Sequence, residues 1–232
     1  MMKTRWGALC WILGALTFPA QILAALHWPQ PYSWSSNLIS DLGVTVCGTF
    51  NAGTGVERMI CSPWHLLANA STVANGLLIT AGAVLLWSVW PRRRQGQWAM
   101  GLLAAGGLLV AGVGLLPWNL YPAAHEAVAL LQAVCQWAGM ILLVCALRGG
   151  RRYRTLAGAT ALGVLVSMGG FVLFLSGIGG AGSPALGPGT AERIAFDSLT
   201  LWGVAAGSLL LRVQRRLQSP SSGRDPALRP VA

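Results

Sequence analysis

Acidic and histidine side chains that could carry chemistry lie in a polar segment, 27–64, and at the starts of later apolar runs. Carboxylate and imidazole groups can bind a metal, transfer a proton or hydrogen-bond a polar ligand. A zinc hydrolase within a membrane could draw its ligands from His65, His125, Asp41 and Asp197. No Walker loop, HExxH, GxSxG or CxxC motif occurs, so the spacing does not demand such an enzyme.

Polar side chains continue from these positions into three apolar runs at helical spacing. Residues three, four or seven apart share one face of a helix. The three stripes are His65, Asn69 and Thr72; His125, Gln132 and Gln136; and Arg193, Asp197 and Thr200. Arg193 can also pair with Asp197 one turn on. Because side chains this polar avoid lipid, the stripes predict one outward-opening polar pocket between the even-numbered helices.

The same residues also have a purely structural interpretation. A carboxylate in a first helical turn, such as Glu126 or Glu192, complements the positive end of the helix. Asn, Gln and Thr in membrane helices often hydrogen-bond to neighbouring helices without binding a ligand. The stripes alone do not separate these two interpretations.

Six apolar runs must position these side chains. They span about 6–26, 65–90, 98–116, 125–147, 155–178 and 193–211. A run of about 20 apolar residues can cross a bilayer, and only 9% of the chain is charged, against about 25% in soluble domains. We therefore predict an all-α polytopic membrane protein with six transmembrane helices in residues 1–212, an extracytoplasmic loop at 27–64 and a disordered basic tail at 213–232. The first run also fits a signal peptide, but a retained helix kinked by Pro19 completes an even number.

Basic residues predict the orientation of these helices. With the N-terminus in the cytoplasm, all of the sixteen Lys and Arg residues except Arg58 and Arg193 lie on the cytoplasmic side. The net charge of +10 therefore reflects membrane topology and not nucleic-acid binding, because the basic clusters separate apolar runs. Both termini are predicted to be cytoplasmic. The abundance of Arg, Gly and Ala favours a bacterial plasma membrane.

Two of the five cysteines lie in the polar segment, at Cys47 and Cys61. A segment outside the cytoplasm meets oxidising conditions, which favours a disulfide between them, with two free thiols as the alternative. Cys10, Cys135 and Cys145 lie in apolar runs and behave there as small hydrophobic residues.

A short helical turn is predicted within the polar segment at 37–42. Ser or Asn at 35–37 can cap its start, and Gly43 suits its end. Asp41 would lie on its flank, directed at the mouth of the bundle or into water, and Ser40 could hold its carboxylate. Asp41 could equally serve only to cap a turn.

The pair Tyr32-Ser33, the motif Ile-Ser-Asp-Leu-Gly at 39–43 and the fourth run beginning at His125 resemble a prokaryotic membrane family, domain of unknown function 998. The resemblance covers about 6–211 and implies a multi-pass membrane protein of no established activity. It adds the positions of its motif to the candidates. The candidate ligand-binding residues are then Tyr32, Ser33, Ser40, Asp41, His65, Asn69, His125, Glu126, Arg193 and Asp197.

Three functions follow as expectations. The first is binding of a lipid headgroup or small amphiphile in the outward-facing pocket, without turnover. The second is a membrane-embedded metal-dependent lipid hydrolase, and the third is a structural or assembly role. We expect the lipid bilayer as the partner, with no nucleic acid. No catalytic residue, metal ligand or cofactor is assigned.

Overall fold

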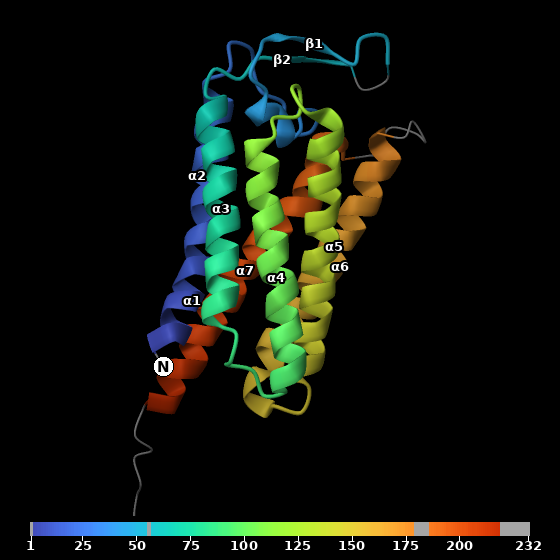
Figure 1. Cartoon of the computed structure of the whole chain (residues 1–232). Helices are drawn as coiled ribbons and strands as arrows, with labels where there is room; N and C mark the ends of the chain where they lie inside the picture. Colours follow the sequence, from blue (N-terminus) through green and yellow to red (C-terminus); the bar gives the residue numbers. More distant parts are fainter. Residues whose placement is uncertain (1, 55–56, 179–185, 219–232) are drawn as a thin grey trace, which may run out of the picture.

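The computed structural model describes residues 2–54, 57–178 and 186–218 and is mostly helical (Figure 1). Within these residues, six helical spans are long and apolar enough to cross a membrane. The helices are α1 (Met2–Leu13), α2 (Thr17–Leu26), α3 (His65–Leu85), α4 (Arg93–Leu115), α5 (Pro122–Leu147), α6 (Arg154–Ile178) and α7 (Pro188–Gln218). The prediction of six long apolar helices is confirmed.

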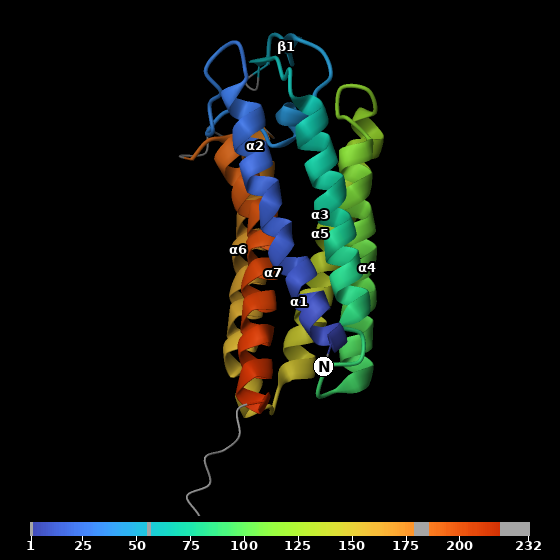
Figure 2. The same cartoon turned by 90° about the vertical axis from the view of Figure 1, so that its left-hand side faces the viewer.

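The first span consists of α1 and α2 joined by a short 3₁₀ turn, η1 (Gly14–Leu16). Pro19 lies one turn beyond this break. Its ring removes a backbone donor and crowds the carbonyl four residues earlier, which is Ala15, so the α-helical hydrogen bonding is interrupted there. Figure 2 shows the two helices following one another between α3 and α7, against which α1 packs.

The hydrophobic core occupies the end of the bundle that holds the N-terminus. Its largest fully buried side chains include Leu86, Met100, Leu103, Met140 and Leu143, with Trp11 and Trp202 packed among them. Small residues allow helices to approach closely. A side chain at Gly76, for example, would collide with the backbone of Gly107 and Ala111, so α3 and α4 touch there through their main chains.

The polar segment lies at the opposite end of the bundle (Figure 1). It contains a 3₁₀ turn, η2 (Ser40–Gly43), and two antiparallel strands, β1 (Gly48–Phe50) and β2 (Arg58–Ile60). A disulfide joins Cys47 to Cys61 at the base of this hairpin, which confirms the predicted pair. The helical turn predicted at 37–42 is shorter and shifted, because the Asp41 carboxylate accepts the Leu38 N–H and fixes residues 38–41 in a turn.

Helix α7 is longer than the predicted sixth run at both ends. It begins at Pro188 and continues to Gln218, seven residues past Leu211. Arg, Gln and Leu are strong helix formers, so the helix continues into the start of the predicted tail. The rest of that tail, 219–232, and residues 179–185 between α6 and α7 lie outside the described residues.

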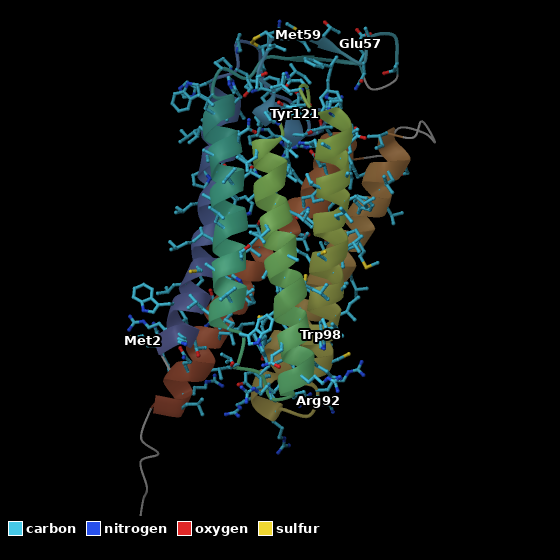
Figure 3. All side chains as sticks on the ribbon, in the orientation of Figure 1. Met2, Glu57, Met59, Arg92, Trp98 and Tyr121 are labelled. Atoms are coloured by element: carbon cyan, nitrogen blue, oxygen red, sulfur yellow. A yellow bond between two sulfur atoms is a disulfide. The ribbon has the colours of Figure 1, made fainter. Side chains whose placement is uncertain are left out.

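The two ends of the bundle differ in charge. Arg92 lies at the same end as Met2 and Trp98, whereas Glu57, Met59 and Tyr121 lie at the end that carries the hairpin (Figure 3). The turns between α3 and α4 and between α5 and α6, which hold the arginine clusters, are both at the end with the N-terminus (Figure 1).

Candidate functional site

The η2 turn is anchored by a buried ion pair. Asp41 is completely buried, and Arg58 of β2 approaches its two carboxylate oxygens at 2.6 and 2.7 Å. The Leu38 N–H donates to the same carboxylate at 2.8 Å. The predicted placement of Asp41 in water, held by Ser40, is therefore wrong, because the disulfide-linked hairpin brings Arg58 over it and excludes water. The alternative prediction, that Asp41 caps a turn, agrees with the hydrogen bond from the Leu38 N–H.

Helix α3 and the loop that precedes it hold the turn from one side. Asn69 Nδ2 donates to the carbonyl of Gly43 at 2.9 Å, and Ser62 Oγ donates to the carbonyl of Leu42 at 2.7 Å. A Cβ at Gly43 would collide with the Asn69 amide. Glycine is needed here for this close approach and not for a left-handed backbone, since Gly43 is absent from the positive-φ glycines of the described residues.

Helix α7 holds the turn from the other side. The Ile39 N–H donates to the buried carboxylate of Glu192, and Arg193 Nη1 donates to the carbonyl of Asn37 at 2.9 Å. Arg193 also donates to the hydroxyl of Tyr32 and lies over the ring of Trp34, 4.9 Å from its centre. The turn thus connects the second and last spans of the bundle.

Tyr32, in the same polar segment, also supports the turn. Its hydroxyl donates to the carbonyl of Leu38 at 2.8 Å, and its ring packs edge-on against Trp28. Burial raises the pKa of the Tyr32 phenol, although the charge of Arg193 opposes the shift. The phenol therefore stays protonated and keeps donating to the Leu38 carbonyl.

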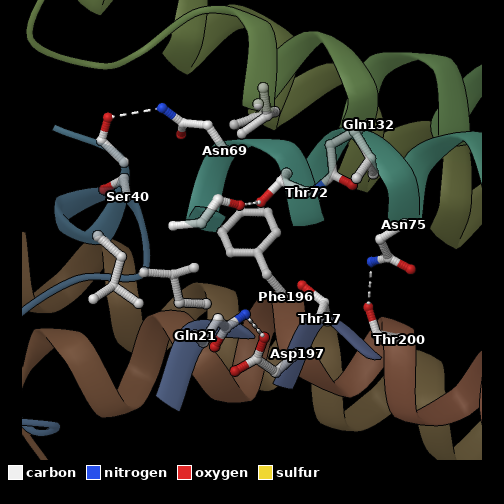
Figure 4. Close-up of a pocket in the computed structure, with 18 of the residues that line it drawn as sticks. Thr17, Gln21, Ser40, Asn69, Thr72, Asn75, Gln132, Phe196, Asp197 and Thr200 are labelled. Atoms are coloured by element: carbon white, nitrogen blue, oxygen red, sulfur yellow. Dashed lines mark hydrogen bonds between the residues drawn. The ribbon is translucent and has the colours of Figure 1, made fainter. Parts of the chain in front are cut away.

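A polar cavity of about 110 Å³ lies beneath the η2 turn (Figure 4). A water molecule needs roughly 10–15 Å³ measured this way, so the space is large enough for a small molecule. Its polar lining comes from the turn and four spans: Ser40; Thr17 and Gln21; Asn69, Thr72 and Asn75; His125, Gln132 and Gln136; and Glu192, Asp197 and Thr200. We call this space the polar cavity.

The three predicted stripes meet at the polar cavity, but not every member reaches it. Of the candidate residues, the lining contains Ser40, Asn69, His125 and Asp197, whereas it does not contain Tyr32, Ser33, Asp41, His65, Glu126 or Arg193. His65 Nδ1 lies 3.0 Å from the carbonyl of Ser62, and the exposed Glu126 accepts a hydrogen bond from Trp118. Ser33 donates its N–H to the Asn37 side chain within the loop.

The first span supplies a fourth stripe that the sequence interpretation missed. Gln21 Nε2 donates to Asp197 Oδ1 at 3.1 Å, and Thr17 lines the cavity one turn away. The expected pair between Arg193 and Asp197 is absent from the ion pairs of the described residues. Arg193 is instead drawn to the loop. Thr17 and Gln21 are four residues apart in an apolar run, so the same periodicity could have identified them.

Hydrogen bonds inside the polar cavity leave one acceptor without a donor. Asn75 Nδ2 donates to Thr200 Oγ1 at 3.0 Å, and Gln136 Nε2 donates to Gln132 Oε1 at 2.8 Å. Asn75 Oδ1 is buried and has no partner among the described residues. This oxygen faces Gly14 of the η1 turn, where an added Cβ would lie 2.7 Å from it, so it is closed off from the cavity.

The four residues named above as possible zinc ligands do not come together at one site. Among the described residues, no group of three or more His, Cys, Asp and Glu side chains is placed to hold a metal ion. His125 Nδ1 lies 2.7 Å from the carbonyl of Leu116, and Asp41 is paired with Arg58.

Six long apolar helices around a polar cavity are typical of a multi-pass membrane protein. The chain belongs to the family described as "Protein of unknown function (DUF998)", whose family model matches residues 12–209. This confirms the resemblance inferred from the Ile-Ser-Asp-Leu-Gly motif. No curated protein and no solved structure matches the chain.

Proposed function

We propose that this protein binds a lipid headgroup or small amphiphile in the polar cavity, without chemical turnover. The observation that carries the proposal is the convergence of polar side chains from four spans on one cavity beneath the η2 turn. Polar groups within a bilayer are costly unless they pair or serve a pathway or ligand. A purely structural role explains the paired amides, but it does not explain the open space that they line.

The polar cavity combines features of a site for an amphiphile. Amides, hydroxyls and carboxylates occupy part of its wall, while Ile39, Leu42, Val110, Val113 and Leu199 occupy the rest. Small-molecule sites commonly pair an apolar wall with a few convergent polar groups. A ligand with a polar head and a short apolar portion would satisfy both parts of this wall.

The cavity end of the bundle is proposed to face away from the cytoplasm, in the outer leaflet of the cell membrane. Arginine clusters mark the cytoplasmic ends of membrane helices, and here they lie at the end opposite the hairpin (Figure 3). The disulfide between Cys47 and Cys61 also favours an oxidising compartment for the hairpin end. Insertion of alkaline phosphatase at 51–54 should give active enzyme, whereas fusion after Gln218 should give inactive enzyme; the reverse pattern would overturn this orientation.

Native mass spectrometry of the protein purified in a mild uncharged detergent tests the binding proposal. We expect a reproducible adduct in the wild type and its loss in Thr72→Trp, because the larger side chain would fill the polar cavity. Leu66→Trp is a matched control on the same helix, since Leu66 is 73% exposed and points away from the bundle. Absence of an adduct from the wild type, or equal adducts in all three proteins, would reject the proposal.

A further inference from the structure

The charged side chains that line the polar cavity are acidic. Glu192 and Asp197 both lie in its wall, whereas no Lys or Arg does among the described residues. A phosphate or carboxylate group entering this space would meet like charge at short range in a water-poor environment, where repulsion is strong. The lining therefore selects against an anionic head.

Asp197 is the carboxylate most available to a ligand. Its Oδ1 accepts a hydrogen bond from the neutral amide of Gln21, and both side chains project into the cavity region in Figure 4. Arg193 lies one helical turn away, but its guanidinium is directed to the loop carbonyls and the Tyr32 hydroxyl. An amide neutralises no charge, so a cation in the cavity would gain a direct partner in Asp197.

The charge balance around the η2 turn points in the same direction. Counted as ionised, the acidic and basic groups of the turn and the cavity are Asp41, Glu192 and Asp197 against Arg58 and Arg193. Arg58 is committed to Asp41 through two contacts. The remaining groups are two carboxyls, Glu192 and Asp197, and the guanidinium of Arg193, which is directed to the loop.

We propose that the polar cavity takes the ammonium group of a small amphiphilic amine, with Asp197 as its acceptor. This proposal rests on the proposed function and specifies its ligand class. An ammonium group has three N–H donors, and Phe196 adds an aromatic side chain to the same lining. The apolar part of the lining accommodates the alkyl portion. A bare alkali ion would use neither that apolar wall nor most of the 110 Å³.

Three six-carbon probes of matched length test the ligand class: n-hexylamine, 1-hexanol and hexanoate. Their dissociation constants are measured at pH 7 by tryptophan fluorescence or calorimetry on the full chain in uncharged detergent. We expect hexylammonium to bind at least about tenfold more tightly than hexanol, and hexanoate not to bind, since tenfold corresponds to one modest charge-assisted interaction. Sodium chloride at equal ionic strength is included as a bare-cation arm.

Variants assign the effect to the proposed residues. Asp197→Asn should bring hexylamine to the affinity of hexanol while leaving hexanol binding unchanged. Glu57→Gln, which removes the same charge from the exposed hairpin turn, should change neither. The thermal unfolding of each variant without probe separates lost binding from lost folding.

The outcomes distinguish the two proposals. Equal affinity for hexylamine and hexanol, both lost in Thr72→Trp, would overturn the ammonium assignment and leave the proposed amphiphile site standing. Stronger binding of hexanoate, or full displacement of hexylamine by sodium alone, would also overturn it. If no probe binds and the wild type carries no adduct, both proposals fall together.

Discussion

Two polar regions lie against one another at one end of the bundle, and they differ in how their hydrogen bonds are satisfied. We call residues 32–43 with Arg58 the roof segment. In the roof segment, the Asp41 carboxylate accepts hydrogen bonds from Arg58 and a backbone N–H, and the Gly43 carbonyl accepts one from an amide side chain of α3. In the polar cavity below it, Asp197 receives a neutral amide and Asn75 Oδ1 receives nothing among the described residues.

This difference separates residues that maintain the structure from residues that can bind a ligand. A buried polar group with its partners in place holds its neighbours, and removing one partner is costly. A cavity group with unused capacity contributes little to folding and remains available to a ligand. In the motif Ile-Ser-Asp-Leu-Gly, Asp41 and the Gly43 carbonyl belong to the first kind, although every motif residue except Asp41 also lines the cavity. Arg193 combines both kinds, because its Nη1 donates to loop carbonyls whereas its Nε is buried without a partner among the described residues.

The largest loss of stability is expected from Arg58→Leu. It would leave the fully buried carboxylate of Asp41 without its cation, which typically costs about 3–5 kcal/mol in the free energy of unfolding. Thermal or denaturant unfolding in detergent measures the effect. The double variant Asp41→Asn, Arg58→Leu should recover part of the loss, and a single-variant cost under about 1 kcal/mol would contradict the structural role of the pair.

Removal of the disulfide should have the next largest effect. Replacing Cys47 and Cys61 together with Ser opens a loop of sequence separation 14, for which loop-closure entropy gives a loss of about 3 kcal/mol. Reduction of the wild type should produce the same shift in unfolding temperature. Cys145→Ser, at a free cysteine in α5, is the matched control and should shift it much less. An equal shift in both would mean that the bridge does not stabilise the hairpin.

Gly43→Ala should cost about 1–3 kcal/mol, because the added methyl group would force the Asn69 amide away from the turn. Gly158→Ala in α6 is the matched control, since a Cβ there meets nothing within 4 Å. In a helix that change should be neutral or stabilise by roughly 0.4–1 kcal/mol. Unfolding in detergent compares the two, and similar results would remove the argument for close packing at Gly43.

The smallest change in stability is expected from Asp197→Asn in the polar cavity. The new amide can still accept the hydrogen bond from Gln21, and a partly buried charge is removed, so the free energy of unfolding should stay within about 1 kcal/mol. The same variant should lose its preference for amines. If the free energy of unfolding without ligand fell by more than about 3 kcal/mol, Asp197 would be a structural residue like those of the roof segment. The two regions would then not differ in the way described.

Sequence periodicity was sufficient for much of this structure. Six apolar runs predicted the six helices, and polar residues at helical spacing predicted that Asn69, His125 and Asp197 would face a common space. The disulfide followed from the placement of Cys47 and Cys61 in one polar segment. These features depend on local pattern and on the chemistry of the bilayer, which a sequence displays directly.

The wrong predictions share one physical cause, which is competition from distant partners. Arg193 was assigned to Asp197 by spacing along one helix, but Tyr32 and the Asn37 carbonyl, about 160 residues away, bind its guanidinium. The place of Asp41 was left open between the mouth of the bundle, water and a capped turn, because Arg58 reaches it only after the hairpin folds. No local rule ranks such partners. Gln21 is an exception, since it lies four residues after Thr17 and the periodicity of the first run could have identified it.

The contact between Ile39 and Glu192 joins residues that are 153 positions apart, and it has a consequence for biogenesis. Synthesis proceeds from the N-terminus, so the hairpin and its disulfide can form while α7 is still inside the ribosome. The Ile39 N–H and the Tyr32 hydroxyl must then wait for Glu192 and Arg193. Docking of the last helix is therefore the step that closes the polar cavity, and a chain arrested before Pro188 would carry the oxidised hairpin above an unfinished site.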